Sequence, residues 1–218
     1  MWCPKLSLWY IEAYKEKHIH PTTIDESYAI FPKRLYERLP LKPEKLYDFC
    51  FIGSLYTDDY ANPRILPRRE WILPFIKENF QDKSYLQFTD KEAKKRHTVL
   101  GKFDYTLIRT GFVPKEVLNI KDRNVYDERY YTNMCKSKFC LCPGGDKKWS
   151  MRFYEALMCK TIPIVHEKNN FHRSKAESKL GYKYYLSSDK HFVYRGDWVE
   201  HNYKLFLQHH TLDSHTVA

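Results

Sequence analysis

Residues 137–165 read SKFCLCPGGDKKWSMRFYEALMCKTIPIV, and this stretch predicts a strand, a polar loop, a helix and a second strand in close succession. The apolar run at 139–142 ends at a proline, which is typical of a buried strand. Ser150 is a favourable N-cap, and the apolar residues at 153, 156 and 157 fall on one face of the helix that follows. The run at 161–165 predicts the next buried strand, with Pro163 as its one irregular feature.

The junction between this loop and its helix is where we expect a ligand. Gly144 and Gly145 let the backbone approach a bound molecule closely, and they use two of only 7 glycines in the chain. A helix N-terminus favours a phosphate, whereas Arg152 in the first turn opposes the helix dipole unless an anion lies between them. Glu155 shares a helical face with Arg152 and can accept hydrogen bonds from two vicinal hydroxyls. A phosphate beside a ribose indicates a nucleotide.

The same stretch resembles the signature of the exostosin-type glycosyltransferases, glycosyltransferase family forty-seven. That signature runs S-K-F-C-L-x-P-x-G, then S-x-R-x-x-E-A, then a glycine and I-P-V. One position departs from it, because Lys160 stands where the family usually has a glycine suited to a left-handed helix C-cap. The matching residues are Ser137, Lys138, Phe139, Cys140, Leu141, Pro143, Gly145, Ser150, Arg152, Glu155, Ala156, Ile162 and Pro163.

The resemblance implies the C-terminal, nucleotide-sugar-binding domain of a GT-B glycosyltransferase, with Arg152 near the diphosphate and Glu155 on the ribose. The expected donor is a UDP-sugar, the acceptor is a hydroxyl of a glycan or a protein, and no cofactor is needed. Most members of this family invert the anomeric centre, which requires a general base. Asp58, Asp59 and Glu167 are candidates for that base, but the sequence marks none of them, so the catalytic residue is left unassigned.

Strands alternate with helices along the rest of the chain, which predicts an α/β fold with a Rossmann-like, doubly wound, mostly parallel sheet. Further strands are predicted at 47–54, 84–89 and 182–186, with a strand or an irregular connection at 105–112. Helices are predicted at 71–80, 91–100, 113–119, 127–135 and 196–209. We expect the nucleotide-sugar-binding domain to span 47–218. Residues 1–46 then form a short N-terminal extension, or a remnant of the acceptor-side domain with its linker.

One more glycine and one more arginine belong to the predicted donor site. Gly53 ends the strand at 47–54, and in the GT-B pattern the turn after that strand faces the ligand. Arg64, Arg68 and Arg69 precede the helix at 71–80, and Arg69 is the one assigned to a phosphate, although for any single one of them the pattern somewhat favours an exposed loop arginine. The full predicted donor-binding set is Arg152, Glu155, Ser150, Gly144, Gly145, Gly53 and Arg69.

Composition limits the remaining possibilities. The net charge of +10 fits an anionic ligand, a membrane surface or nucleic acid, but the basic residues are dispersed and no nucleic-acid partner is expected. The six cysteines contain no C-x-x-C pair, which predicts buried thiols and no metal site. No Asp-x-Asp motif occurs, so the site is expected to be metal-independent. No membrane-spanning stretch or signal peptide is recognised, which predicts a soluble and by default cytoplasmic protein, although family relatives are often anchored in the Golgi.

Two other functions stay open beside glycosyl transfer. The first is a non-catalytic nucleotide-sugar-binding or scaffolding module, acting with a partner chain that supplies the acceptor site. The small size of the region before residue 47 favours this alternative. The second is a nucleic-acid binder, which the charge and the aromatic content of 17% suggest but no motif supports.

Overall fold

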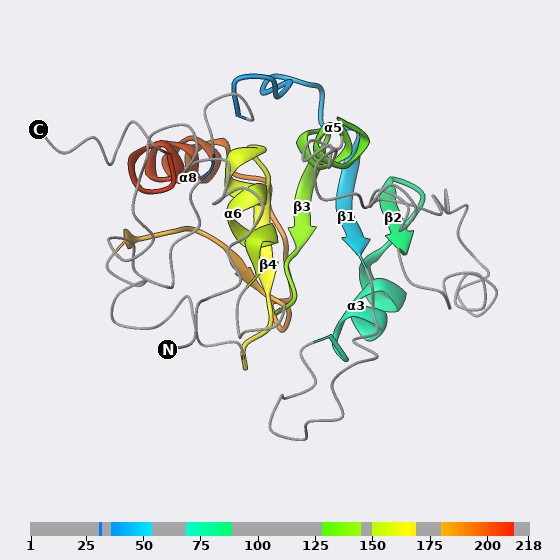
Figure 1. The fold of residues 1–218 in the computed structure, drawn as a ribbon. Helices are drawn as coiled ribbons and strands as arrows, with labels where there is room; N and C mark the ends of the chain where they lie inside the picture. Colours follow the sequence, from blue (N-terminus) through cyan, green and yellow to red (C-terminus); the bar gives the residue numbers. More distant parts are fainter. Residues whose placement is uncertain are drawn as a thin grey trace, which may run out of the picture.

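The computed structural model describes residues 31, 36–53, 69–88, 128–144, 150–168 and 180–211. Its elements in chain order are β1 (Tyr47–Gly53), α3 (Ile72–Asn79), β2 (Ser84–Phe88), α5 (Glu128–Cys135), β3 (Ser137–Leu141), α6 (Met151–Met158), β4 (Ile162–Val165), β5 (Tyr185–Leu186) and α8 (Gly196–His209) (Figure 1). This alternation confirms the predicted α/β class. The elements predicted at 91–100, 105–112 and 113–119 lie outside the described residues.

The strands form one parallel sheet in the order β2-β1-β3-β4-β5. All of its pairs are parallel, so the arrows of β1, β2 and β3 point the same way in Figure 1 and their carboxyl ends share one edge. The strand β3 begins two residues earlier than predicted, because Ser137 already pairs with Tyr47. The last strand is shorter than the predicted 182–186, because only Tyr185 and Leu186 pair with β4.

The sheet is covered on both faces, and its alternating side chains enter two separate cores. On β1, Cys50 and Ile52 join the core formed with α5 and α6, whereas Phe51 joins the core formed with α3. Each fully buried side chain of this size stabilises the fold by roughly 1.5–3 kcal/mol. The five described cysteines are all buried and unbridged, and all five lie in the core formed with α5 and α6. Because helices cover both faces of the parallel sheet, the predicted doubly wound arrangement is confirmed.

Part of the predicted N-terminal extension packs into this same fold. Phe31 is fully buried, its ring centroid lies 5.5 Å from that of Phe206 on α8, and its N–H donates to the carbonyl of His210. Tyr36 and Leu39 are buried in the same core. The domain boundary at residue 46 stays a prediction, but these side chains stabilise the α/β core directly.

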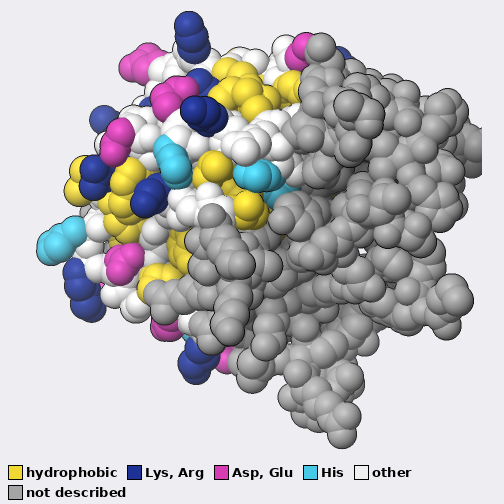
Figure 2. All heavy atoms as spheres, turned by 90° about the vertical axis from the view of Figure 1, so that its left-hand side faces the viewer, with side chains coloured by type: hydrophobic (Ala, Val, Ile, Leu, Met, Phe, Trp, Pro, Cys, Tyr) yellow, Lys and Arg dark blue, Asp and Glu magenta, His cyan; other side chains and the backbone are white. Residues whose placement is uncertain are grey.

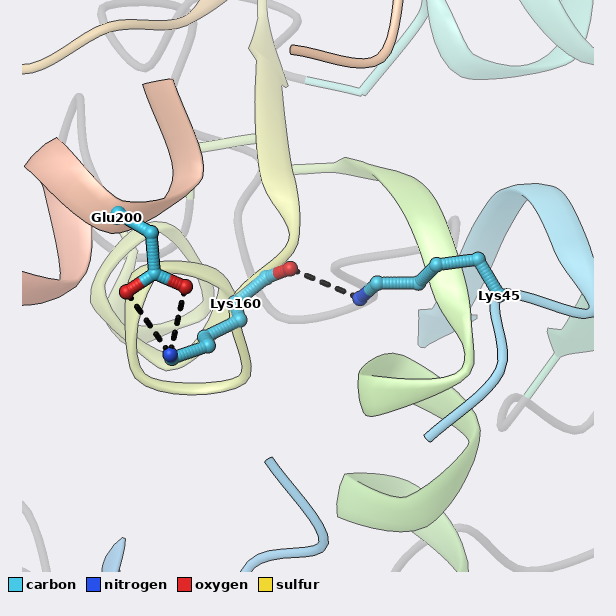
Figure 3. Close-up of polar contacts among 3 residues, drawn as sticks. All are labelled: Lys45, Lys160 and Glu200. Atoms are coloured by element: carbon cyan, nitrogen blue, oxygen red, sulfur yellow. Dashed lines mark hydrogen bonds and ion pairs between the residues drawn. The ribbon is translucent and has the colours of Figure 1, made fainter. Parts of the chain in front are cut away.

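The C-terminus of α6 explains how the chain accommodates the departure at position 160. The N–H of Thr161 donates to the carbonyl of Ala156 and that of Lys160 to Leu157, which together form a Schellman motif. Lys160 occupies its left-handed position with a φ of 54°. The Lys160 side chain pairs with Glu200 on α8, and its carbonyl accepts a hydrogen bond from Lys45 (Figure 3). Lysine therefore adopts the conformation expected of glycine and adds contacts that glycine lacks.

The surface around α8 carries mixed charge. On the described part of the face in Figure 2, lysine and arginine side chains are interspersed with acidic and hydrophobic ones instead of forming one basic patch. Among the helices that the structure describes, none has the length and apolar character needed to cross a bilayer.

Candidate functional site

The carboxyl edge of the sheet contains the point where the winding of the fold reverses. The strand β2 lies on one side of β1, whereas β3, β4 and β5 follow on the other side. In open parallel sheets of this kind, ligands bind outside the carboxyl ends of the two strands that flank such a reversal. Gly53 ends β1, and Gly144 lies three residues beyond the end of β3. Both predicted glycines are therefore at the edge where a ligand is expected.

Arg152 of α6 reaches over the end of β1. A Cβ atom built on Gly53 would lie 2.6 Å from Nη2 of Arg152 and 3.2 Å from its Cζ. Real Cβ contacts are not that short, so the guanidinium occupies the space that any larger residue at position 53 would fill. The Cζ atom also lies 5.4 Å from the ring centroid of Phe51. The structure thus brings together two predicted site residues from segments about a hundred positions apart.

The guanidinium of Arg152 is buried, and none of the residues that the structure describes forms an ion pair with it. The residue is only 9% exposed, and within the described part of the chain neither Nε nor Nη1 has a hydrogen-bond acceptor. Burial alone lowers the pKa of Arg152, but Tyr130, the thiols of Cys140 and Cys142, and Glu155 outweigh it and raise the pKa above its ordinary value. A buried cation with unused donors is suited to bind a phosphate, because a guanidinium offers paired N–H groups in one plane.

Ser150 has the predicted position but does not make the predicted cap bond. It is the N-cap of α6, with an extended φ of −139°, yet its side chain makes no capping hydrogen bond. Its Oγ is buried and has no partner among the described residues. The predicted N-cap position of Ser150 is therefore confirmed, although its hydroxyl makes no capping hydrogen bond. Two positions before Arg152 in the sequence, this hydroxyl is therefore another buried polar group without a hydrogen-bond partner among the described residues.

Arg69 lies next to the loop that follows β3. Its Nε donates to the carbonyl oxygen of Gly144 over 3.3 Å. This contact links the segment before α3 to the loop before α6, across a separation of 75 residues. Arg69 is thus a half-buried loop residue that contacts the predicted site loop, and its role in binding a phosphate stays a prediction.

Glu155 lies one turn further along α6 and is tied to α5. The hydroxyl of Tyr130 donates to its Oε2, and that of Tyr131 donates to its Oε1 over 3.3 Å. The residue is 8% exposed. Both carboxylate oxygens accept tyrosine hydroxyls, so Glu155 joins two helices in addition to any contact with a ligand. A ribose role for Glu155 remains a proposal.

Comparison with known families gives one match over most of this site. The family model described as the exostosin GT47 domain matches residues 59–193, which is more than half of the chain. The chain belongs to the exostosin GT47 family. The match includes Arg69, Ser150, Arg152 and Glu155, so the resemblance of residues 137–165 is confirmed as a family relationship. Gly53 lies outside the matched range, and its place in the site rests on its contact with Arg152.

Of the candidates for the general base of this GT47 domain, the structure describes Glu167 but not the two aspartates. Asp58 and Asp59, like Gly145, lie outside the described residues. Glu167 follows β4 at the same edge of the sheet as Gly53. Burial raises its pKa, but hydrogen bonds from the backbone and Ser187, with His166 nearby, outweigh that effect and lower the pKa below its ordinary value. The role of Glu167 as the general base stays a prediction.

Sequence reasoning missed several residues at or near the candidate site. Tyr130 and Tyr131 were assigned only to a helix, and no local signal marks them as partners of a residue 24 or 25 positions away. Trp71 was assigned to the apolar face of a helix, although its indole Nε1 is buried and has no acceptor among the described residues. Within the described ranges, no three His, Cys, Asp or Glu side chains group closely enough to hold a metal ion.

Proposed function

We propose that this GT47 domain binds a nucleotide-sugar donor and transfers its sugar to a hydroxyl of a glycan or protein. The observation that carries the proposal is the buried guanidinium of Arg152, which lies over Gly53 at the reversal point and whose Nε and Nη1 have no acceptor among the described residues. Two N–H groups in that state favour an anion, and the start of α6 beside them adds the positive end of a helix dipole. A diphosphate fits both features.

In the reaction, these residues act on the leaving group. Cleavage of the glycosidic bond leaves negative charge on the nucleoside diphosphate, and a preformed cation stabilises that charge without rearranging. Arg152 is in place for this, because Phe51 and the backbone of Gly53 fix its guanidinium. We infer that the transfer needs neither a metal ion nor a cofactor, that UDP is the nucleotide, and that Glu155 contacts the ribose.

The experiment measures nucleotide binding by calorimetry for the Arg152→Met variant, with UDP and GDP as probes. Loss of charge-assisted hydrogen bonds is expected to lower affinity by about 10- to 150-fold. Because the variant replaces a buried cation that has no ion pair among the described residues, its free energy of unfolding should stay equal or rise. The matched control is Arg195→Met, because Arg195 is exposed and pairs with Asp197. Unchanged UDP and GDP affinity with a clear loss of stability would refute the proposal.

Glu155→Gln separates its two possible roles. If the carboxylate contacts the ribose, affinity for UDP should fall more than affinity for inorganic pyrophosphate. If it only joins α6 to α5, stability should fall and both affinities should stay unchanged.

A second candidate function is a non-catalytic nucleotide-sugar-binding module that works with a partner chain. The contacts of Glu167 favour it, because Oε2 of this carboxylate accepts a hydrogen bond from Ser187 and Oε1 lies 3.7 Å from Nε2 of His166. Release of UDP from UDP-sugars, with and without EDTA, distinguishes the two functions. Turnover by the purified chain supports the enzyme, and binding without turnover supports the module.

A further inference from the structure

The buried polar side-chain atoms that lack a partner are not scattered through the described structure. They belong to Trp71, Ser150 and Arg152. Trp71 immediately precedes α3, and the other two residues lie at the start of α6. Both helices begin at the carboxyl edge of the sheet, because each follows a strand in a parallel crossover. Buried donors without partners are rare in folded proteins, so three residues at one edge indicate that a ligand completes their hydrogen bonds.

Trp71 lies away from Arg152 along that edge. It is 8% exposed, and its ring centroid is 5.9 Å from that of His166, the residue directly after β4. It is also 5.8 Å from the ring of Phe75 on the same helix. The indole is therefore held at the end of β4 on the face covered by α3, by contacts that leave its N–H without an acceptor among the described residues.

The two positions are two strands apart. Arg152 lies over the end of β1, Trp71 and His166 lie at the end of β4, and β3 runs between them. Neighbouring strands are spaced by 4.7–4.9 Å, so the ends of β1 and β4 are about 10 Å apart along the edge of the sheet. That separation is comparable to the length of a hexose joined to a diphosphate.

The groups around Trp71 are suited to neutral hydroxyls. The backbone N–H of Lys168 donates to Nδ1 of His166 over 3.1 Å, which places the proton of a neutral imidazole on Nε2. Oε1 of Glu167 lies 3.7 Å from that Nε2, and Oε2 accepts a hydrogen bond from Ser187. A carboxylate in this position repels a second phosphate. Indole and imidazole N–H donors beside a carboxylate acceptor match the hydroxyls of a sugar.

We propose that Trp71 and His166 form a second subsite that binds the sugar of the donor, with the indole N–H donating to a sugar oxygen. The inference rests on the proposed function, because it needs the diphosphate at Arg152. It also gives the ligand a direction. Glu155 lies on the face covered by α5, whereas Trp71 lies on the face covered by α3. The nucleoside and the sugar then extend to opposite sides of the guanidinium.

The test uses Trp71→Phe, which removes the N–H but keeps an aromatic ring in the core. Calorimetry compares UDP with UDP-glucose and UDP-galactose, and GDP with GDP-mannose and GDP-fucose, for wild type and variant. Removal of one hydrogen bond is expected to weaken binding of the sugar nucleotide about 5- to 10-fold. Binding of the matching nucleoside diphosphate should stay within twofold of wild type. Trp198→Phe, on α8, is the matched control.

The outcomes separate this inference from the proposed function. If wild type binds neither UDP nor GDP, the proposed function fails and the subsite fails with it. If Trp71→Phe weakens the nucleoside diphosphate as much as the sugar nucleotide, or weakens neither, only the sugar subsite is overturned. Binding of UDP or GDP without binding of any sugar nucleotide also overturns it. A second variant, His166→Phe, should show the same selective loss, and it keeps Trp71 available if Trp71→Phe does not fold.

Discussion

Replacement of Lys160 by glycine or by alanine tests how the chain tolerates a left-handed residue at the end of α6. Lys160 has a φ of 54°, a conformation that costs an L-residue roughly 1–2 kcal/mol and costs glycine nothing. Its side chain compensates in two ways. Nζ lies 2.7 Å and 3.0 Å from the two carboxylate oxygens of Glu200, and 4.6 Å from the ring centroid of Tyr203 (Figure 3).

The expected magnitudes follow from the exposure of these partners. The Glu200 side chain is 66% exposed, so solvent limits the ion pair to about 0.5 kcal/mol. The contact with Tyr203 contributes about 0.5–1 kcal/mol. Lys160→Ala loses both contacts and keeps the backbone strain, so it should lower the free energy of unfolding by about 1–1.5 kcal/mol. Lys160→Gly loses the same contacts but relieves the strain, so its change should be within about 0.5 kcal/mol of zero.

Urea unfolding followed by tryptophan fluorescence measures these differences, because the free energy falls linearly with denaturant. Both variants retain the carbonyl of residue 160 as the acceptor for Lys45, so that contact cancels in the comparison. In the double variant Lys160→Ala with Glu200→Gln, the losses should be less than additive, and the coupling should shrink in high salt. The reasoning is refuted if alanine at position 160 is as stable as glycine.

Two further predictions concern stability. Ser150→Ala should cost less than about 0.5 kcal/mol in urea unfolding, below the usual loss of about 1 kcal/mol for an N-cap, because the hydroxyl makes no cap bond; a loss above 1 kcal/mol would show that it caps α6 in solution. Lys45→Met should cost about 2–4 kcal/mol at pH 7, because the carbonyls of Cys135, Ser137 and Lys160 each lose a donor. In the folded chain, burial lowers the pKa of Lys45 to about 8, although nearby thiols partly oppose this shift. Between pH 8 and 10.5 the unfolded chain therefore binds more protons at this residue than the folded chain does. Wild type should therefore gain stability relative to Lys45→Met as the pH rises through that window, by at most about 1.4 kcal/mol per pH unit, and a constant difference would contradict the lowered pKa.

The fold was largely predictable because its central elements carry strong local signals. The apolar runs that became β1, β3 and β4 are short, and the connections between them are long enough to contain the helices of parallel crossovers. The sheet order was not predictable from these runs. It depends on which strand ends pair across more than 80 residues, as Tyr47 does with Ser137. Packing of the segment around Phe31 against Phe206 depends equally on tertiary contact, so the sequence marks it only as an extension.

In the candidate site, too, some residues could be predicted from the sequence and others could not. Arg152 and Glu155 were found because each residue is unusual in its own helix, one by charge against the dipole and the other by spacing from the first. The pairing of Gly53 with Arg152 was not predictable, because a glycine that ends a strand has many local explanations. The hydroxyl of Ser150 was misassigned for a related reason. Its residue type and position predict a capping bond that only the side-chain rotamer decides.

The state of Arg152 implies that folding and binding are coupled in this domain. A buried donor without a partner costs about 1–3 kcal/mol, and Nε and Nη1 both lack one among the described residues. Folded proteins are stable by only about 5–15 kcal/mol, so such a cost is a sizeable fraction of the total. An anion that satisfies these donors must return that energy on binding. Ligand-free Arg152→Met should therefore melt no lower than wild type, whereas UDP or GDP at a fixed concentration should raise the melting temperature of wild type more than that of the variant. If the guanidinium only stabilised the core, ligand-free Arg152→Met would melt below wild type. The shift in melting temperature caused by UDP or GDP would then be the same in both proteins.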